Sequence, residues 1–229
     1  MKSIFVLDSV DSTQDEIVRR LKAGEHVEAI LARKQTLGRG RFGRKWLSTT
    51  GESLTLSFAW HEATDWPWPA GLALAAGLAA AEAFDTSIAW PNDLVIGGRK
   101  VGGILSEIVT CPTGRVPVIG LGVNLTQSAR PEGLPRASSL QLEGRPPMLP
   151  TEAAVAFLDS ISRQTLPCTF SEIENRWRIR DATRGKKYTL PDGRIAVALR
   201  VDEHGCLVTT VDGEEYTVPS AEAIYGSGS

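Results

Sequence analysis

Residues 35–51 constrain the fold more than any other segment, because they follow neither the helical period nor the strand period. Apolar runs typical of strands lie on both sides, at residues 27–32 and 54–59. A long aperiodic segment inside a compact domain is usually a functional loop and not a simple connection. The sequence therefore predicts two strands joined by a long loop with a function of its own.

Strand-type and helix-type segments are intermixed along the remaining sequence without a strict strand–helix–strand repeat. Further strands are predicted at residues 4–7, 87–95, 100–109 and 116–123, with a turn at 96–99. Helices are predicted after a polar cap at residues 11–13, from Pro67 or Pro69 through Ala80, from Thr151 through Ile161, and at residues 170–177. This order favours an α+β domain built on a mixed β-sheet with helices.

The pattern changes after Asp181 to short alternating runs separated by turns rich in Gly, Asp and Pro. These runs lie at residues 188–190, 195–201, 206–211 and 216–218. An all-β module of about 45 residues is too small to be very stable unless it packs on the first domain. We therefore expect a main domain at residues 1–180, a small β domain at 181–226 and a flexible tail at 227–229.

The formal net charge of −2 gives no general reason for the chain to bind nucleic acid or an anionic membrane. An odd number of cysteines, at unrelated spacings and without a paired motif, indicates reduced thiols and no metal site: Cys111, Cys168 and Cys206. Asp8 ends an apolar run too short for a signal peptide, and no stretch approaches the roughly 18 apolar residues of a membrane span. We expect a cytoplasmic protein without membrane or nucleic-acid partners.

Positive charge gathers in the long loop, where no acidic residue occurs between residues 33 and 45. Three glycines alternate there with three arginines: Gly38, Arg39, Gly40, Arg41, Gly43 and Arg44. Glycine lets the backbone approach a ligand closely, and guanidinium groups hold phosphate or carboxylate oxygens. The spacing matches neither the Walker nor the Rossmann phosphate motif. A solvated basic loop or an RNA-binding tract would have a similar composition, although a single compact loop argues against the tract.

A second group of polar residues surrounds a predicted hairpin. Asp93 ends the sequence Trp90-Pro91-Asn92-Asp93, and Lys100 follows across the Gly97-Gly98 turn. The hairpin can place the carboxylate beside the ammonium, where the pair could orient an acyl carbonyl and help to deprotonate an amine. An ordinary ion pair of a hairpin is the plainer explanation.

Two shorter patterns add polar groups beside strands. Ser12, Thr13 and Gln14 follow the first strand and suit hydrogen bonding to a urea-like ring, although a Ser or Thr here also caps a helix. Asn124 closes the sequence Gly120-Leu121-Gly122-Val123-Asn124, and its amide can pair with an adenine or ribose edge. Each pattern is weak by itself.

Taken together and in this order, these patterns resemble a biotin protein ligase. The motifs that carry the resemblance are Asp11-Ser12-Thr13-Gln14, Gly38-Arg39-Gly40-Arg41-Phe42-Gly43-Arg44-Lys45-Trp46, Trp90-Pro91-Asn92-Asp93-Leu94, Lys100-Val101-Gly102-Gly103-Ile104-Leu105 and Gly120-Leu121-Gly122-Val123-Asn124. They cover residues 3–124, and a weaker likeness continues to Tyr225. The resemblance implies the family's class II synthetase-like catalytic domain, followed by a small SH3-like β-barrel.

Members of this family form biotinyl-5′-adenylate from biotin and MgATP and pass the biotin to a lysine of a biotin carboxyl carrier protein. The resemblance implies this activity, a partner that is the carrier of acetyl-CoA carboxylase or of a related carboxylase, and a homodimer. The catalytic residues that it implies are Lys100, Arg41 and Asp93. Biotin would contact Ser12, Thr13, Gln14, Gln35, Gly38, Arg39, Lys100 and Gly103. ATP would contact Arg39, Arg41, Arg44, Trp46, Asn92 and Asn124, and no side chain is expected to be a dedicated Mg²⁺ ligand.

Three positions depart from the usual pattern of the family, in that an asparagine, an arginine and a lysine are replaced by Gln14, Phe42 and Ala89. Arg41, Asp93 and Lys100 are kept, so we expect an active enzyme. Too few residues precede Ser12 for the winged-helix domain of the family's repressors, so no specific DNA binding is expected. Two alternatives stay open, a lipoate or octanoate transferase of the same superfamily and a biotin-binding protein without catalysis.

Overall fold

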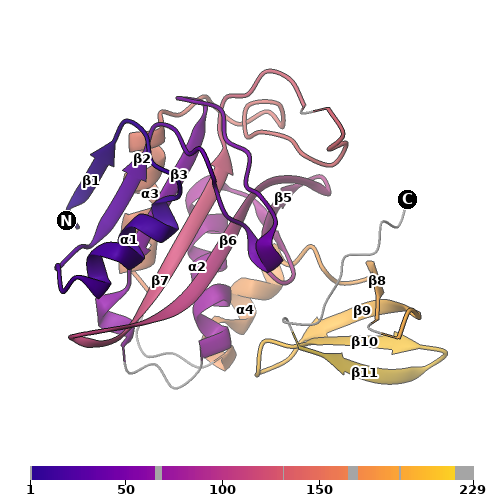
Figure 1. The fold of residues 1–229 in the computed structure, drawn as a ribbon. Coiled ribbons are helices and arrows are strands. Elements are labelled where there is room, and N and C mark those ends of the chain that lie inside the picture. The colour runs from indigo at the N-terminus through magenta and orange to yellow at the C-terminus, as the bar shows by residue number, and fades with distance from the viewer. Residues whose placement is uncertain (1, 65–68, 131, 165–169, 191, 220–229) are drawn as a thin grey trace.

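The computed structural model describes residues 2–64, 69–130, 132–164, 170–190 and 192–219. Predictions made for Pro67, for Cys168 and for the Gly-Ser tail lie outside these ranges. Seven strands form the larger of two sheets (Figure 1). From one edge to the other they are β1 (Ile4–Leu7), β2 (Ala29–Ala32), β3 (Ser53–Ala59), β7 (Gly114–Asn124), β6 (Arg99–Cys111), β5 (Asp93–Ile96) and β4 (Ser87–Ala89).

The larger sheet is mixed, as predicted for an α+β domain. β1 pairs with β2 in parallel, and every other pairing in this sheet is antiparallel. β6 and β7 are its longest strands and run side by side through the middle of the molecule (Figure 1). Residues 35–51 connect β2 to β3 with only a short 3₁₀ turn at Arg41–Gly43, which agrees with the predicted long loop.

Helices cover both faces of this sheet (Figure 1). α1 (Thr13–Lys22) lies on one face, is capped by Ser12 and buries Ile17 and Leu21. α2 (Pro69–Phe84), α3 (Pro150–Ser162) and α4 (Phe170–Arg180) pack together on the opposite side. α2 is rich in alanine, and these small side chains allow residues 71–84 to lie close to the strands, where most of them are buried. No helix in the described part of the chain is long and apolar enough to cross a membrane.

The sequence predicts one strand over residues 87–95, and this prediction is wrong. The chain reverses at residues 90–92, so that β4 and β5 form an antiparallel hairpin in which Ala89 pairs with Asp93. Pro91 has no N–H to donate to a strand ladder, which favours a break at this position. Asn92 lies in the turn between the two strands, and its side-chain Nδ2 donates to the Ile104 carbonyl of β6 at 2.7 Å.

The smaller sheet contains β8 (Lys187–Thr189), β9 (Ile195–Val201), β10 (Leu207–Val211) and β11 (Glu214–Val218) in antiparallel order. This arrangement is consistent with the predicted SH3-like domain. Trp90 joins the two sheets: its indole N–H donates to the Gly205 carbonyl at 3.0 Å, and its backbone N–H donates to Thr183 Oγ1 at 2.8 Å. The Tyr188 hydroxyl donates to the Trp90 carbonyl at 3.2 Å. Buried side chains from both sheets belong to one hydrophobic cluster, so the smaller sheet packs on the larger one.

Candidate functional site

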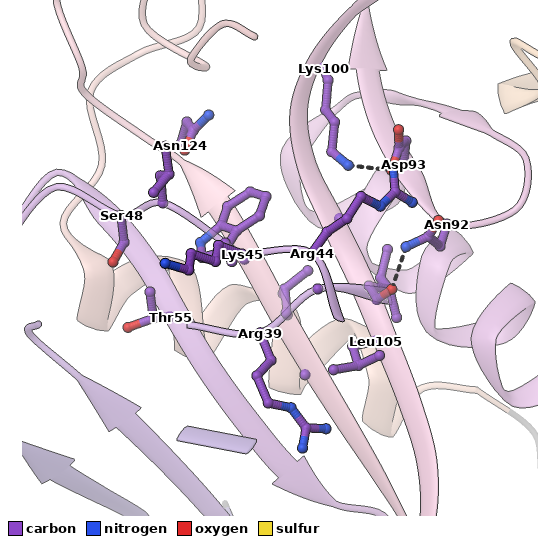
Figure 2. Close-up of a pocket in the computed structure, with 18 of the residues that line it drawn as sticks. Arg39, Arg44, Lys45, Ser48, Thr55, Asn92, Asp93, Lys100, Leu105 and Asn124 are labelled. Atoms are coloured by element: carbon purple, nitrogen blue, oxygen red, sulfur yellow. Dashed lines mark hydrogen bonds and ion pairs between the residues drawn. The ribbon is translucent and has the colours of Figure 1, made fainter. Parts of the chain in front are cut away.

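One large cavity of about 1110 Å³ lies on the same side of the larger sheet as the long loop. Its walls come from the start of α1, the loop, β3, β5, β6 and β7, and from a segment at residues 134–137 (Figure 2). All predicted site residues line this cavity except Gly38: Ser12, Thr13, Gln14, Gln35, Arg39, Arg41, Arg44, Trp46, Asn92, Asp93, Lys100, Gly103 and Asn124. The tertiary structure therefore brings together residues that are widely separated in the sequence.

Lys100 and Asp93 form the ion pair that the hairpin predicts. Lys100 Nζ lies 2.6 Å from Asp93 Oδ1 in the cavity wall (Figure 2). Gly97 and Gly98 have φ angles of 55° and 80°, which a tight hairpin turn requires and which glycine adopts without strain. A Cβ atom at Gly103 would lie 3.5 Å from Lys100 Nζ, so the missing side chain leaves the ammonium open to a ligand.

Alternating glycines on β7 make the floor of the cavity. Leu121 and Val123 point into the core, so Gly120 and Gly122 face the cavity together with Asn124. A Cβ atom at Gly122 would lie 2.7 Å from Cζ2 of Trp46, and one at Gly120 would lie 2.7 Å from Oε1 of Gln14. The glycines therefore provide the space in which an indole and an amide rest on the strand.

The long loop folds over this floor. The Trp46 N–H donates to the Gly38 carbonyl at 2.8 Å, and the Gly40 N–H donates to the Arg44 carbonyl at 2.7 Å. Gly38 itself does not line the cavity, because it supports Trp46: a Cβ there would lie 2.6 Å from the Trp46 carbonyl oxygen. The indole Nε1 of Trp46 is buried against β7 and has no acceptor among the described residues.

A hydrogen-bonded network lines the end of the cavity next to α1. Gln35 Oε1 accepts from the Thr13 N–H at 2.8 Å and from the Thr13 hydroxyl at 3.0 Å. Ser57 Oγ lies 3.0 Å from Thr13 Oγ1 and donates to Gln14 Oε1 at 2.9 Å. Ser12 also accepts from the Asp15 N–H at 3.4 Å, so it caps α1 and lines the cavity at the same time.

Cations of the loop differ in their surroundings. Arg39 is paired with two carboxylates and points away from Lys100 and Asp93 (Figure 2). Arg41 donates to Asn92 Oδ1 at 3.4 Å. Within the described ranges, no ion pair holds Arg44 or Lys45, so both cations are available to an anion in the cavity.

The segment from residue 134 to 137 was not foreseen as part of the site. The Lys100 N–H donates to the Arg136 carbonyl at 2.7 Å, and the Ser138 N–H donates to the Lys100 carbonyl at 2.8 Å. Asn124 Nδ2 donates to the Ser138 carbonyl at 2.8 Å. No local period signals this pairing, because it depends on contacts between distant parts of the chain. Sequence reasoning also missed other lining residues: Ser48, Thr55, Ser57, Gln127 and Leu134.

Comparisons with known proteins agree with this geometry. A sequence model of the Biotin/lipoate A/B protein ligase family matches residues 6–124, which is more than half of the chain. The biotin--[acetyl-CoA-carboxylase] ligase of Paracoccus denitrificans is 30% identical, with 96% of this chain and 100% of that protein covered. The bifunctional ligase/repressor BirA of Escherichia coli K12 is 31% identical, with 92% of this chain and 70% of that protein covered.

Solved structures show the same fold over both sheets. The biotin protein ligase of Aquifex aeolicus in complex with biotin and ATP superimposes with a TM-score of 0.81 and 27% identity, and 98% of each chain is covered. The match extends well beyond residues 6–124, so the smaller sheet is part of the shared architecture. On the family model and these full-length likenesses, the chain belongs to the biotin/lipoate A/B protein ligase family.

Proposed function

We propose that this protein is a biotin protein ligase, which forms biotinyl-5′-AMP and transfers biotin to a lysine of a biotin carboxyl carrier protein. The observation that carries the proposal is a single cavity with three different regions. It joins the polar end at Ser12, Thr13 and Gln35 to the Lys100–Asp93 pair and to the cations of the loop. A cyclic urea, a carboxylate and a polyphosphate would each meet matching groups.

In the first step, a biotin carboxylate oxygen attacks the α-phosphorus of ATP, and the bond to the pyrophosphate oxygen breaks. Lys100 would bridge the carboxylate and the α-phosphate and neutralise the charge that develops there. Asp93 orients the ammonium at 2.6 Å. Arg41 and Arg44 line the same cavity and would extend this positive field to the departing pyrophosphate.

In the second step, the neutral amine of the carrier lysine attacks the biotinyl carbonyl carbon. The acyl–phosphate bond breaks and AMP leaves, while the attacking nitrogen loses one proton. Asp93 is the carboxylate that lines the cavity beside Lys100 and can help to accept this proton. Trp46, Asn92 and Asn124 would hold the adenylate until the transfer.

Mg²⁺ belongs to the substrate MgATP in this proposal. Within the described ranges, no group of three or more His, Cys, Asp or Glu side chains could hold a metal ion. Asp93 is already bonded to Lys100. Phosphate oxygens and water are the ligands that Mg²⁺ prefers in such sites, and the loop cations complement the remaining charge.

The biotin end would be formed by Ser12, Thr13, Gln14 and Gln35, with the backbone of Gly103 beside the ligand. Hydroxyl and amide groups suit a urea ring, which both donates and accepts hydrogen bonds. Their mutual bonds hold these side chains in place before a ligand arrives.

We propose a main domain at residues 1–180 and a β domain at 181–226, which is supported by the change of sheet between β7 and β8. A homodimer is proposed from the resemblance. A cytoplasmic location is proposed from the expectation of reduced thiols, which is supported by free Cys111 and Cys206. A carboxylase carrier is the proposed partner, because relatives are named for acetyl-CoA carboxylase. The net charge of −2 supports the proposal that nucleic acid is not a partner.

The test is ATP-dependent transfer of biotin to a purified carrier domain, measured by mass. Lys100→Ala should slow adenylate formation by at least about 100-fold, because removing one preorganised donor costs about 3 kcal/mol. Lys22→Ala, which removes an exposed lysine at the end of α1, is the matched control and should remain as active as the parent. Equal rates for Lys100→Ala and the control would contradict the assigned role.

The same assay separates the two other candidates. Lipoate or octanoate replaces biotin in a parallel reaction, because the matched family also contains lipoate ligases. Faster use of either acid than of biotin would favour the transferase. Binding of biotin without release of pyrophosphate from ATP would favour a silent binding protein.

A further inference from the structure

Arg39 is bonded to two carboxylates on two different elements. Its Nη1 donates to Asp15 Oδ1 on α1 at 2.6 Å, and its Nη2 donates to Glu107 Oε1 on β6. All three side chains are partly buried, with between 33% and 39% of their surface exposed. The guanidinium therefore connects the loop to both elements that enclose the polar end of the cavity.

Glu107 is itself held in place by a hydrogen bond from Gln14, which rests on β7. Its second oxygen accepts from Gln14 Nε2 at 2.9 Å, and Gln14 Oε1 in turn accepts from Ser57 at 2.9 Å. Gln14 fits there because Gly120 has no side chain. Glu107 is thus a fixed acceptor joined to the floor of the site, and not a freely rotating surface carboxylate.

The Arg39 side chain does not point in the direction expected of a residue that binds the phosphates of ATP. Figure 2 shows its side chain pointing away from Lys100 and Asp93, where the reacting groups would meet. Two anionic partners already satisfy its charge, whereas no ion pair within the described ranges holds Arg44 or Lys45. Arg39 therefore differs from Arg44 and Lys45: it anchors the loop, whereas the other two cations can bind a polyphosphate.

We propose that Asp15 and Glu107 are positioning residues that hold Arg39 and thereby keep the loop over the biotin end before any ligand binds. We call Asp15, Arg39 and Glu107 the Arg39 latch. The start of the loop is fixed separately, because the Leu37 N–H donates to the Asp11 carbonyl at 2.8 Å. The latch then fixes the segment that carries Trp46. The part of this inference that concerns biotin rests on the proposed function.

Hydrogen exchange of the ligand-free protein, followed by mass spectrometry, tests the latch directly. Asp15→Asn and Glu107→Gln should each speed exchange at residues 38–46 by about 2- to 5-fold, and the double variant should do so by about 10-fold, as expected for partly exposed ion pairs. In Glu107→Gln the new amide oxygen can still accept from Gln14, so the variant isolates the bond to Arg39. Unchanged exchange in all three variants would overturn the latch.

Glu215→Gln is the matched control, because it removes a carboxylate paired with an arginine in the smaller sheet. It should leave exchange at residues 38–46 unchanged, and equal acceleration there would overturn the proposal. The amides of β9 and β10 report folding in Asp15→Asn and Glu107→Gln. Those amides should exchange as in the parent, so that any change in the loop is local.

Kinetics test whether the latch serves binding. In Asp15→Asn and Glu107→Gln, the KM for biotin should rise by about the same 2- to 5-fold, while kcat and the KM for ATP stay near the parent values. Faster loop exchange with an unchanged or lower KM for biotin would overturn the positioning role. If the parent protein lacks ligase activity, the proposed function fails, yet the exchange experiment still decides whether the latch exists.

Discussion

At the scale of single residues, the cavity depends as much on missing side chains as on charged ones. Gly122→Ala would place a methyl group against the indole of Trp46. We expect Trp46 to be displaced and kcat/KM for ATP to fall by about 10- to 100-fold, because small displacements of positioning groups have effects of this size. Steady-state kinetics with varied ATP would measure the change.

The control for this prediction is a glycine in the hydrophobic core. Gly77 lies inside α2, where an added Cβ would make ordinary contacts of 3.9 Å and 4.0 Å with Ile104 and Ile88. Gly77→Ala should keep full activity and raise the free energy of unfolding by about 0.5–1 kcal/mol, since glycine costs conformational entropy in a helix. An active Gly122→Ala variant would show that Trp46 need not lie on β7.

At the scale of elements, the unforeseen wall of the cavity is fixed by Glu143. Its carboxylate accepts from the Ser138 hydroxyl at 2.6 Å and pairs with Arg99 and Arg130. The hydrogen bond from Ser138 holds the pKa of Glu143 below its usual value of 4.5, and Arg99 and Arg130 add to this effect while burial opposes it. The wall therefore gains stability from an ionised side chain next to the start of β6.

The sign of the pH dependence follows from this lowered pKa. A carboxylate whose pKa is lower in the folded state stabilises the protein above its unfolded pKa, and the gain is lost as the pH falls through the folded pKa. Glu143→Gln should lower the free energy of unfolding by about 1 kcal/mol at neutral pH. Below about pH 4.5, the free energies of unfolding of the variant and the parent should become more alike. Urea unfolding across this range measures it, with Glu174→Gln as an exposed ion-pair control. A difference independent of pH would contradict the prediction.

At the scale of the whole molecule, the two sheets should unfold together. They share one hydrophobic cluster, and Trp90 is fully buried between them. Calorimetry should show a single transition, and Tyr188→Phe, which loses the bond to the Trp90 carbonyl, should lower the free energy of unfolding by about 1 kcal/mol. Two separate transitions would mean that the smaller sheet is an independent domain.

Most local elements and the chemical groups of the site were predictable from the sequence. The capped helix after β1, the long loop, the Gly97-Gly98 hairpin and the Lys100–Asp93 pair all depend on interactions between near neighbours. Residue type and short spacing decide such interactions, because backbone propensity and turn geometry act locally. Many of the cavity's polar residues were therefore accessible without coordinates, whereas Ser48, Thr55, Ser57 and Gln127 were not.

Tertiary structure alone decided how these pieces meet. The reversal at residues 90–92, the pairing of Arg136 with Lys100, and the connection of Arg39 to Glu107 join residues that no periodic pattern relates. They form because burying apolar surface from distant segments brings the backbones together, and the polar groups enclosed there must then find partners. The sequence by itself determined the chemical types of the predicted site residues. Long-range packing determined that Arg39 would be an anchor, that Ser57 and Gln127 would join the lining, and that residues 134–137 would be a wall.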